Sequence, residues 1–508
     1  MRTRRSGCTG SIPCSRFGFQ SRCRNRALQA PRTWVAGISL VTSVLVPGAV
    51  ESQTVDFTPG RVLERVVSPS DSDQQWALYV PSSYDPARPL PILFLMDPRG
   101  RALLPLERVR AAAERFGWAV ISSYNTMSDG PAEPNVLAMN AMLEDAQSIL
   151  SVNTRRFYIA GFSGTARIAW ALTPRLDSAV AGIFGVGAGT PVRAAWLAGS
   201  DAPRVDFFGA AGTTDFNYDE VMGLERWLRT GNHTWALRAF DGAHEWAPAG
   251  LFDDAIAWFE LQAMRRGREP PRQALIDSLY GAWIARADSL TAIGLAPATL
   301  YALDLADEIA RNFRGVHDIA SAEQRAQTLR QDAATRSALE RRRRFANENA
   351  DFNTRFFDLM AEVRRAERPV SAQRVIRDLQ IDGILDDRTN ARADNDPMRA
   401  DAAQRKLETV FMNTSFYAPR TFLDQGRAEH ALAILDVADR IDHNHPRVLY
   451  TRAVALVKLA RTDDALSSLE AAVRAGFPVE GLGTDASFDT LRDHPRFIAL
   501  THRSSGLP

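Results

Sequence analysis

The segment from residue 156 to residue 170 constrains the fold of this chain more than any other stretch of its 508 residues. Phe157–Ala160 is a short apolar run with aromatic and β-branched side chains, which predicts a buried strand. From Ala166 onward, small and apolar residues recur at helical spacing. Ser163 lies between these two patterns and is flanked by glycines. A sharp turn from a strand into a helix, with a serine at its apex, is therefore predicted.

A serine at such a turn is well placed for nucleophilic attack. The tight backbone favours glycine beside it, and the N-terminus of the following helix favours a negatively charged oxygen. The stretch Gly161-Phe162-Ser163-Gly164-Thr165 resembles the G-x-S-x-G nucleophile elbow of the α/β-hydrolase superfamily. It departs from that pattern at the fifth position, where Thr165 replaces glycine, and we expect the turn to tolerate this. Serine between glycines also occurs in plain turns, so further residues are needed.

Strands and helices are predicted to alternate over residues 54–268. The predicted strands are 62–67, 75–80, 92–96, 119–122, 157–160, 180–186, 205–209 and 234–240, and the predicted helices are 135–150, 218–229 and 251–264. Such alternation predicts a mostly parallel sheet covered by helices on both faces. The resemblance implies the same fold class, an α/β-hydrolase domain.

The residues of 54–268 also supply a base and an acid in the chain order of that superfamily, Ser, then Asp or Glu, then His. His244 follows the predicted strand 234–240, whereas His233 stands at its start and is expected to occupy a turn or edge position. Asp215 follows the preceding strand. Asp219 is the competing acid, but it falls in the first turn of a predicted helix, where acids are ordinary partners of the helix dipole. The predicted catalytic residues are Ser163, Asp215 and His244.

An oxyanion hole is implied by the same resemblance. One donor is the backbone N–H of Gly164, the residue after the nucleophile. The other comes from the loop after strand 92–96, whose sequence is Asp97-Pro98-Arg99-Gly100-Arg101. Since proline has no N–H, Arg99 is the predicted second donor and Gly100 the alternative.

The N-terminal 52 residues are predicted to be a signal peptide with a long basic n-region. The first 33 residues hold eight arginines and no acid, and mostly apolar residues follow over Trp34–Val46. This run is too short to cross a bilayer, which takes about 20 residues. Cleavage is expected near Ala49 or Ser52, which predicts a periplasmic or extracellular protein. An organellar transit peptide is the alternative.

Removal of this leader would change both the cysteine content and the charge. All three cysteines, Cys8, Cys14 and Cys23, lie within it, so no disulfide, thiol nucleophile or cysteine metal site is expected in the mature protein. Acids outnumber bases in the rest of the chain, and this predicts no nucleic-acid partner.

Helix-forming residues dominate after the linker 266–271. Helices are predicted at 275–293, 297–312 and 321–364, within a helical region that extends over 270–410. In 412–508, the residues Arg427–Ala438 recur 34 positions later as Arg461–Ala472. This period resembles tetratricopeptide repeats, with a capping helix near the C-terminus. His443 and His445 fall in the turn between repeats, and a metal site there is a minor alternative.

The sequence thus predicts an exported serine hydrolase that cleaves carboxylic esters, with a helical-repeat domain behind it. The resemblance is to polyhydroxybutyrate depolymerases, feruloyl esterases and related esterases, and it implies a small-molecule or polymeric ester substrate. A peptide or protein partner is expected on the repeats, and no cofactor, metal or membrane-spanning segment is expected in the mature protein. The alternatives are a peptidase of the same superfamily and a non-catalytic hydrolase-fold scaffold that binds peptides through its repeats.

Overall fold

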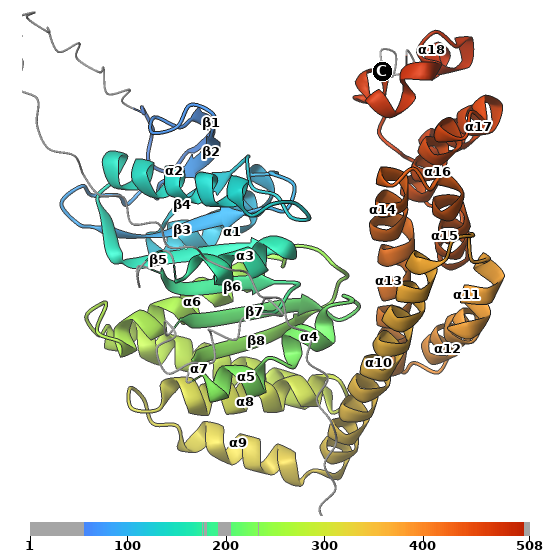
Figure 1. Ribbon diagram of the computed structural model, residues 1–508. Helices are drawn as coiled ribbons and strands as arrows, with labels where there is room; N and C mark the ends of the chain where they lie inside the picture. The colour runs from blue at the N-terminus through green and yellow to red at the C-terminus, as the bar shows by residue number, and fades with distance from the viewer. Residues whose placement is uncertain (1–54, 175, 177–179, 191–204, 232, 502–508) are drawn as a thin grey trace, which may run out of the picture. The chain divides into compact units, whose positions relative to one another are not determined.

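The computed structural model describes residues 55–174, 176, 180–190, 205–231 and 233–501, which all belong to one unit, Gln53–Pro508. The predicted signal peptide lies outside the described residues. Eight strands form one sheet in the order β1-β2-β4-β3-β5-β6-β7-β8 (Figure 1). The strands are β1 Val62–Val67, β2 Gln75–Tyr79, β3 Leu90–Met96, β4 Ala119–Ser123, β5 Val152–Phe162, β6 Val180–Val186, β7 Asp206–Gly212 and β8 Thr234–Phe240.

Strands β3 to β8 run parallel, and β2 joins them antiparallel through β4. Alternate residues of the strands point to opposite faces, and each face carries its own apolar cluster. Helices α1 Leu103–Phe116 and α6 Ala249–Arg265 bury side chains on one face, and α2 Glu133–Ile149, α3 Gly164–Leu172 and α5 Glu225–Thr230 on the other. The predicted α/β-hydrolase fold is confirmed.

Two further helices complete the apolar core on the α1 and α6 face of the sheet. Helices α7 Gln273–Ile293 and α8 Ala298–Phe313 contribute to it, and α9 Ala320–Gln331 adds Ala322. Their buried side chains in that core include Ile276, Leu279, Trp283, Leu305, Ile309 and Phe313. The change of composition at 266–271 is therefore not a break in packing, because the core of the sheet continues across it.

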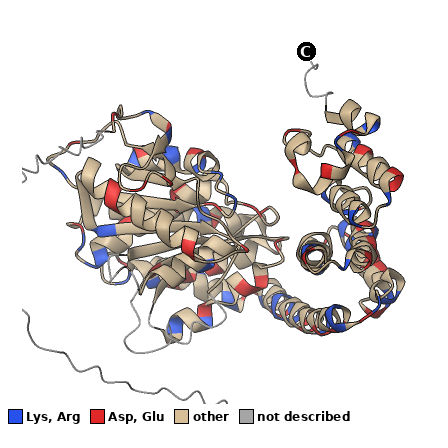
Figure 2. Cartoon of the chain, turned by 45° about the horizontal axis from the view of Figure 1, so that its top comes forward, with Lys and Arg blue, Asp and Glu red and all other residues tan. Residues whose placement is uncertain are grey.

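The helices after α9 build a second core of their own. They are α10 Ala333–Arg365, α11 Ala372–Asp378, α12 Ile381–Ala393, α13 Pro397–Met412, α14 Ala418–Asp424, α15 Ala428–Ile441, α16 Pro446–Lys458, α17 Thr462–Arg474 and α18 Pro495–Thr501. Basic and acidic residues are mixed along them (Figure 2), and several form ion pairs, such as Arg399 with Asp387 and Arg440 with Asp382. The predicted all-helical region is confirmed.

The 34-residue period coincides with helix packing. Helices α15 and α17 start at Ala428 and Thr462, and they flank α16. The repeated residues face the interior, since the pairs Ala431 and Ala465, Leu435 and Leu469, and Ala438 and Ala472 are fully buried. The assignment to tetratricopeptide repeats stays a prediction.

Two sequence expectations about helices were wrong, and one helix was missed. The predicted helix 218–229 is two helices, α4 Tyr218–Met222 and α5, which meet at Gly223. The predicted helix 321–364 breaks at Asp332, whose carboxylate accepts a hydrogen bond from the Thr335 N–H at 2.7 Å and caps α10. Helix α1 was not predicted at all; it begins without a side-chain cap and carries Pro105 in its first turn.

Candidate active site

Ser163 occupies a strained turn between β5 and α3. Its φ is 54° and its ψ is −126°, a conformation that residues with a side chain rarely adopt. The neighbouring glycines are required by space: a Cβ on Gly161 would lie 2.6 Å from the Ala166 nitrogen, and one on Gly164 would lie 2.5 Å from the Ser128 Cβ. The strand–turn–helix predicted from the sequence is present.

Thr165, the departure from the glycine pattern, has its own structural role. Its Oγ1 donates to the Met96 carbonyl at 2.5 Å, and it also lies 2.8 Å from the Phe162 carbonyl. The Phe162 N–H donates to Thr165 Oγ1 at 3.0 Å. The hydroxyl therefore links the end of β3 to the end of β5 directly beneath the turn, where glycine could make none of these bonds.

The structure brings Ser163, His244 and Asp215 into one chain of contacts. The Nε2 of His244 lies 2.9 Å from Ser163 Oγ, and its Nδ1 lies 2.9 Å from both carboxylate oxygens of Asp215. The Asp215 side chain is fully buried and that of His244 is 15% exposed. The three residues follow β5, β7 and β8, so their meeting results from parallel strands that end at one edge of the sheet.

Asp219, the competing acid, is directed elsewhere. Its Oδ2 accepts hydrogen bonds from Asn349 at 2.9 Å and from the Arg405 Nε at 3.2 Å. Asp219 lies in the first turn of α4, as the sequence predicted. Of the two acids, the structure places Asp215 on His244.

The imidazole of His244 is packed between two aromatic rings. The ring centroid of Phe162 lies 4.6 Å away and that of Phe216 lies 4.4 Å away. Gly187, at φ +61°, comes so close that a Cβ there would lie 2.9 Å from Asp215 Oδ2 and 3.2 Å from the His244 Cε1. These contacts leave the imidazole little freedom to leave its position between serine and aspartate.

The two predicted oxyanion donors differ in their surroundings. Gly164 is the first residue of α3, so its N–H has no partner within the helix. The N–H of Arg99 donates to Asp97 Oδ1 at 2.8 Å, and that of Gly100, the alternative, donates to the Asp97 carbonyl at 3.2 Å. To donate to an oxyanion as well, the Arg99 N–H would have to share its hydrogen bond with Asp97.

Asp97 is a site residue that the sequence analysis did not identify. Burial would raise its pKa, but hydrogen bonds from Arg101, from the Trp246 indole and from the N–H groups of Arg99 and Arg101 outweigh burial and hold the pKa below its ordinary value. The indole nitrogen lies 2.8 Å from Asp97 Oδ2. This buried carboxylate thus ties the loop after β3 to the loop that carries His244. A polar residue directly after an apolar strand was the signal available in the sequence.

The other histidines considered in the sequence lie apart from this site. His233 stacks on Trp227, with ring centroids 5.2 Å apart, and its Nδ1 accepts from the Val205 N–H at 3.5 Å. His445 caps α16, and the Nδ1 of His443 lies 3.0 Å from Asp439. Within the described ranges, no three His, Cys, Asp or Glu side chains are grouped to hold a metal ion, and no helix is long and apolar enough to span a bilayer.

The sequence matches no protein-family model and no curated protein. Solved structures similar to part of the chain include the fluorophosphonate-binding serine hydrolase F of Staphylococcus aureus, at 16% identity over 40% of this chain and 98% of that one, with a TM-score of 0.33. A ferulic acid esterase matches at 14% identity over 40% and 98%, with a TM-score of 0.34. An esterase of Pyrobaculum calidifontis matches at 14% over 40% and 86%, with a TM-score of 0.33. At such identities and TM-scores these likenesses carry no argument about activity.

Proposed function

We propose that the protein is a serine hydrolase that cleaves carboxylic esters through an acyl-enzyme. The observation that carries this proposal is the order Ser163 Oγ, His244 Nε2 and Nδ1, Asp215 carboxylate, with each neighbouring pair at 2.9 Å. A nucleophile within hydrogen-bond reach of a base, which a buried acid orients in turn, is the arrangement that acyl transfer needs. The strained backbone at Ser163 and the start of α3 beneath it support the same proposal.

The proposed reaction begins when Ser163 Oγ attacks the ester carbonyl carbon and His244 Nε2 takes the hydroxyl proton. The carbonyl π electrons move onto oxygen, where the Gly164 N–H stabilises the negative charge, with the Arg99 N–H as the proposed second donor. When the tetrahedral intermediate collapses, the bond from the carbonyl carbon to the alkoxy oxygen breaks and His244 returns the proton to the leaving alcohol. Water then repeats these steps on the acyl-serine and releases the acid. Asp215 holds the imidazole tautomer and stabilises the imidazolium.

Substitutions in the site test this proposal. Ser163→Ala, His244→Ala and Asp215→Asn should each lower turnover of p-nitrophenyl acetate by a factor on the order of 10⁴ to 10⁶, and a double variant should lose little more. Ser289→Ala, an exposed serine on α7, is the matched control and should be silent. A Ser163→Ala protein that hydrolyses the ester at the wild-type rate would refute the proposal.

Substrate class needs a separate test. A fluorophosphonate probe should label the wild type and not Ser163→Ala, because it reacts with an activated serine. The absence of labelling would favour a non-catalytic scaffold. A panel of short-chain esters, aryl esters and peptides should show turnover of esters, and turnover of peptides alone would favour the peptidase.

We also propose that the protein is exported, because a basic leader precedes the apolar run Trp34–Val46. Expressed in a Gram-negative host, the protein should appear in the periplasm with a new N-terminus between Ala49 and Gln53. Recovery from the cytosol with Met1 intact would contradict this. A peptide or protein partner on α15 to α17 is likewise a proposal, which rests on the 34-residue period alone.

A further inference from the structure

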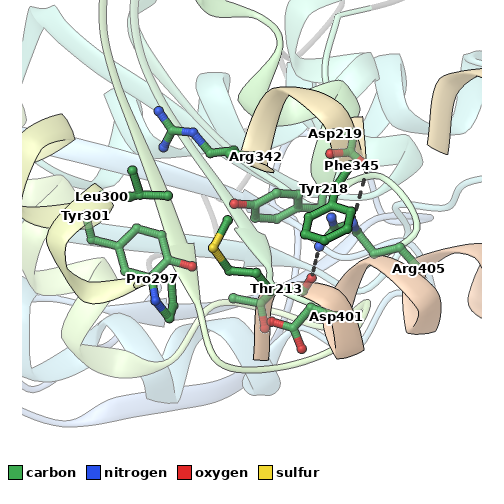
Figure 3. Close-up of a pocket in the computed structure, with 11 residues that line it drawn as sticks. Thr213, Tyr218, Asp219, Pro297, Leu300, Tyr301, Arg342, Phe345, Asp401 and Arg405 are labelled. Atoms are coloured by element: carbon green, nitrogen blue, oxygen red, sulfur yellow. Dashed lines mark hydrogen bonds and ion pairs between the residues drawn. The ribbon is translucent and has the colours of Figure 1, made fainter. Parts of the chain in front are cut away.

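Arg405, a buried residue of α13, contacts the loop that carries Asp215. It is 8% exposed, and its Nη1 donates to the Thr213 carbonyl at 2.8 Å. Its Nε lies 3.2 Å from Asp219 Oδ2, and its guanidinium lies 4.6 Å from the centroid of the Tyr218 ring. Figure 3 shows Arg405 reaching Thr213 and Asp219. One side chain from the helical region therefore holds the chain on both sides of Asp215.

The loop between these two anchors is internally bonded. The Asp215 Oδ1 accepts from the Asn217 N–H at 2.8 Å, and the Asp215 carbonyl accepts from the Tyr218 N–H at 2.9 Å. The Thr213 N–H is bonded to the Phe240 carbonyl at 2.8 Å. Because the loop is tied together in this way, a shift at either anchor would move the Asp215 carboxylate with it.

The charge of Arg405 is paired with that of Asp219. Asp219 accepts from Asn349 of α10 as well as from Arg405, so two helices hold the same carboxylate. A cavity of about 40 Å³ remains beside it, lined by Tyr218 and Tyr301 among others (Figure 3).

Glu408, one turn after Arg405 in α13, interacts electrostatically with the site. Burial raises the pKa of Glu408; a hydrogen bond from Gln404 at 2.8 Å opposes this, and the charge of Asp215 raises the pKa further. His244 acts on Glu408 in the opposite direction. Helix α13 thus runs close enough to Asp215 and His244 to interact with both.

We propose that Arg405 is a positioning residue that holds the Asp215 loop in register with His244, so that α13 is part of the hydrolytic unit. This inference rests on the proposed function. The physical reason is that a displacement of about 1 Å can cost a factor of 10² in rate. Lysine cannot replace Arg405, since a single ammonium lacks the planar fork that reaches the carbonyl and the carboxylate together.

The test compares Arg405→Met and Arg405→Lys with Arg440→Met in the full chain. Arg440 of α15 makes an exposed ion pair with Asp382 and is the matched control. Both Arg405 variants should lower kcat on p-nitrophenyl acetate by a factor of about 10 to 100 with little change in KM, and Arg440→Met should change neither. A folded Arg405→Met protein with wild-type kcat would overturn the inference. If the Met variant does not fold, the Lys variant decides by the same criterion.

Two further measurements separate this inference from the proposed function. Amide hydrogen exchange should become faster over residues 213–219 in the Arg405 variants, whether or not the protein is an esterase. The downfield proton resonance of the His244 imidazole should shift or broaden in these variants and not in Arg440→Met. If Ser163→Ala keeps full activity, the proposed function fails. If Ser163→Ala is inactive but exchange and kcat are unchanged in the Arg405 variants, only the inference about Arg405 fails.

Discussion

Glycine serves different purposes in the site-bearing sheet and in the helices that follow it. Ten glycines between Gly161 and Gly242 are so closely surrounded that a Cβ on any of them would lie less than 3.0 Å from another atom. Ten others, from Gly250 to Gly483, would meet nothing within 4 Å. In the first region glycine lets strands, loops and the site approach one another. In the second it either adopts a positive φ, as at Gly294 after α7, or lies within a helix, as at Gly281 and Gly383. Where φ is negative, substitution of glycine should therefore be tolerated very differently in the two regions.

The largest expected effect is loss of folding when the chain is cut between the sheet and the helices that follow it. A fragment ending at residue 268 should fail to fold, because it lacks Ile276, Leu279, Trp283, Leu305, Ile309 and Phe313, which lie in the core of the sheet. Six such side chains at about 1.5–3 kcal/mol each amount to much of the stability of a domain. A fragment ending at residue 332 keeps them and should fold. Soluble expression and cooperative urea unfolding are the measurements, and a cooperatively folded fragment ending at 268 would place the boundary earlier.

Gly187→Ala should give the next largest effect. A methyl group there would meet Asp215 and His244, and the backbone would be held at φ +61°. We expect turnover about 10²-fold lower and a loss of about 1–3 kcal/mol in the free energy of unfolding. Steady-state kinetics and urea denaturation measure the two quantities. Wild-type turnover in this variant would contradict the inference that closely surrounded glycines of the sheet cannot be replaced.

Asp97→Asn should have a moderate effect that depends on pH. The pKa of Asp97 is held below its ordinary value in the folded protein, so its carboxylate stabilises the fold above the unfolded-state pKa of about 4. This stabilisation is lost as the pH falls through the folded-state pKa. The variant should be less stable than the wild type by about 1–3 kcal/mol at pH 7. Urea unfolding across the acid range should show the difference shrinking, and a difference that grows on acidification would contradict the assignment.

The smallest effect is a gain. Gly383 lies in the first turn of α12, is exposed and has open space around its Cβ position. Gly383→Ala should raise the free energy of unfolding by about 0.5–1 kcal/mol and leave turnover unchanged, since alanine favours helix and restricts the unfolded chain. Thermal unfolding measures the gain. A destabilised Gly383→Ala protein would show that space around Cβ does not separate the two regions.

Most of the sheet could be predicted from the sequence because its strands are continuous apolar runs between turn residues. Strands β6 and β8 begin and end where the apolar pattern does. Helix ends were less predictable, because periodicity continues across the break at Asp332, where a local side-chain bond ends one helix and begins another.

The residues of the site could be named from motif and chain order, and the structure brings Ser163, Asp215 and His244 together. The contact between Arg405 and Asp219 spans 186 residues, and the sequence around neither residue predicts it. The hydrogen bonds of Thr165 are similar, because the link to Met96 depends on which strands become neighbours.

The core of the sheet continues past residue 268, and this affects how the chain folds during synthesis. Strand β8 ends at Phe240, but the core against which the sheet packs includes Phe313 and Ala322. At 5–20 residues per second, the ribosome needs roughly 4–16 s to add the intervening residues. During that interval the finished strands expose the part of this apolar face that the helices after β8 later cover. Any factor that shields nascent chains would have its greatest effect here, well after the last strand has been synthesised.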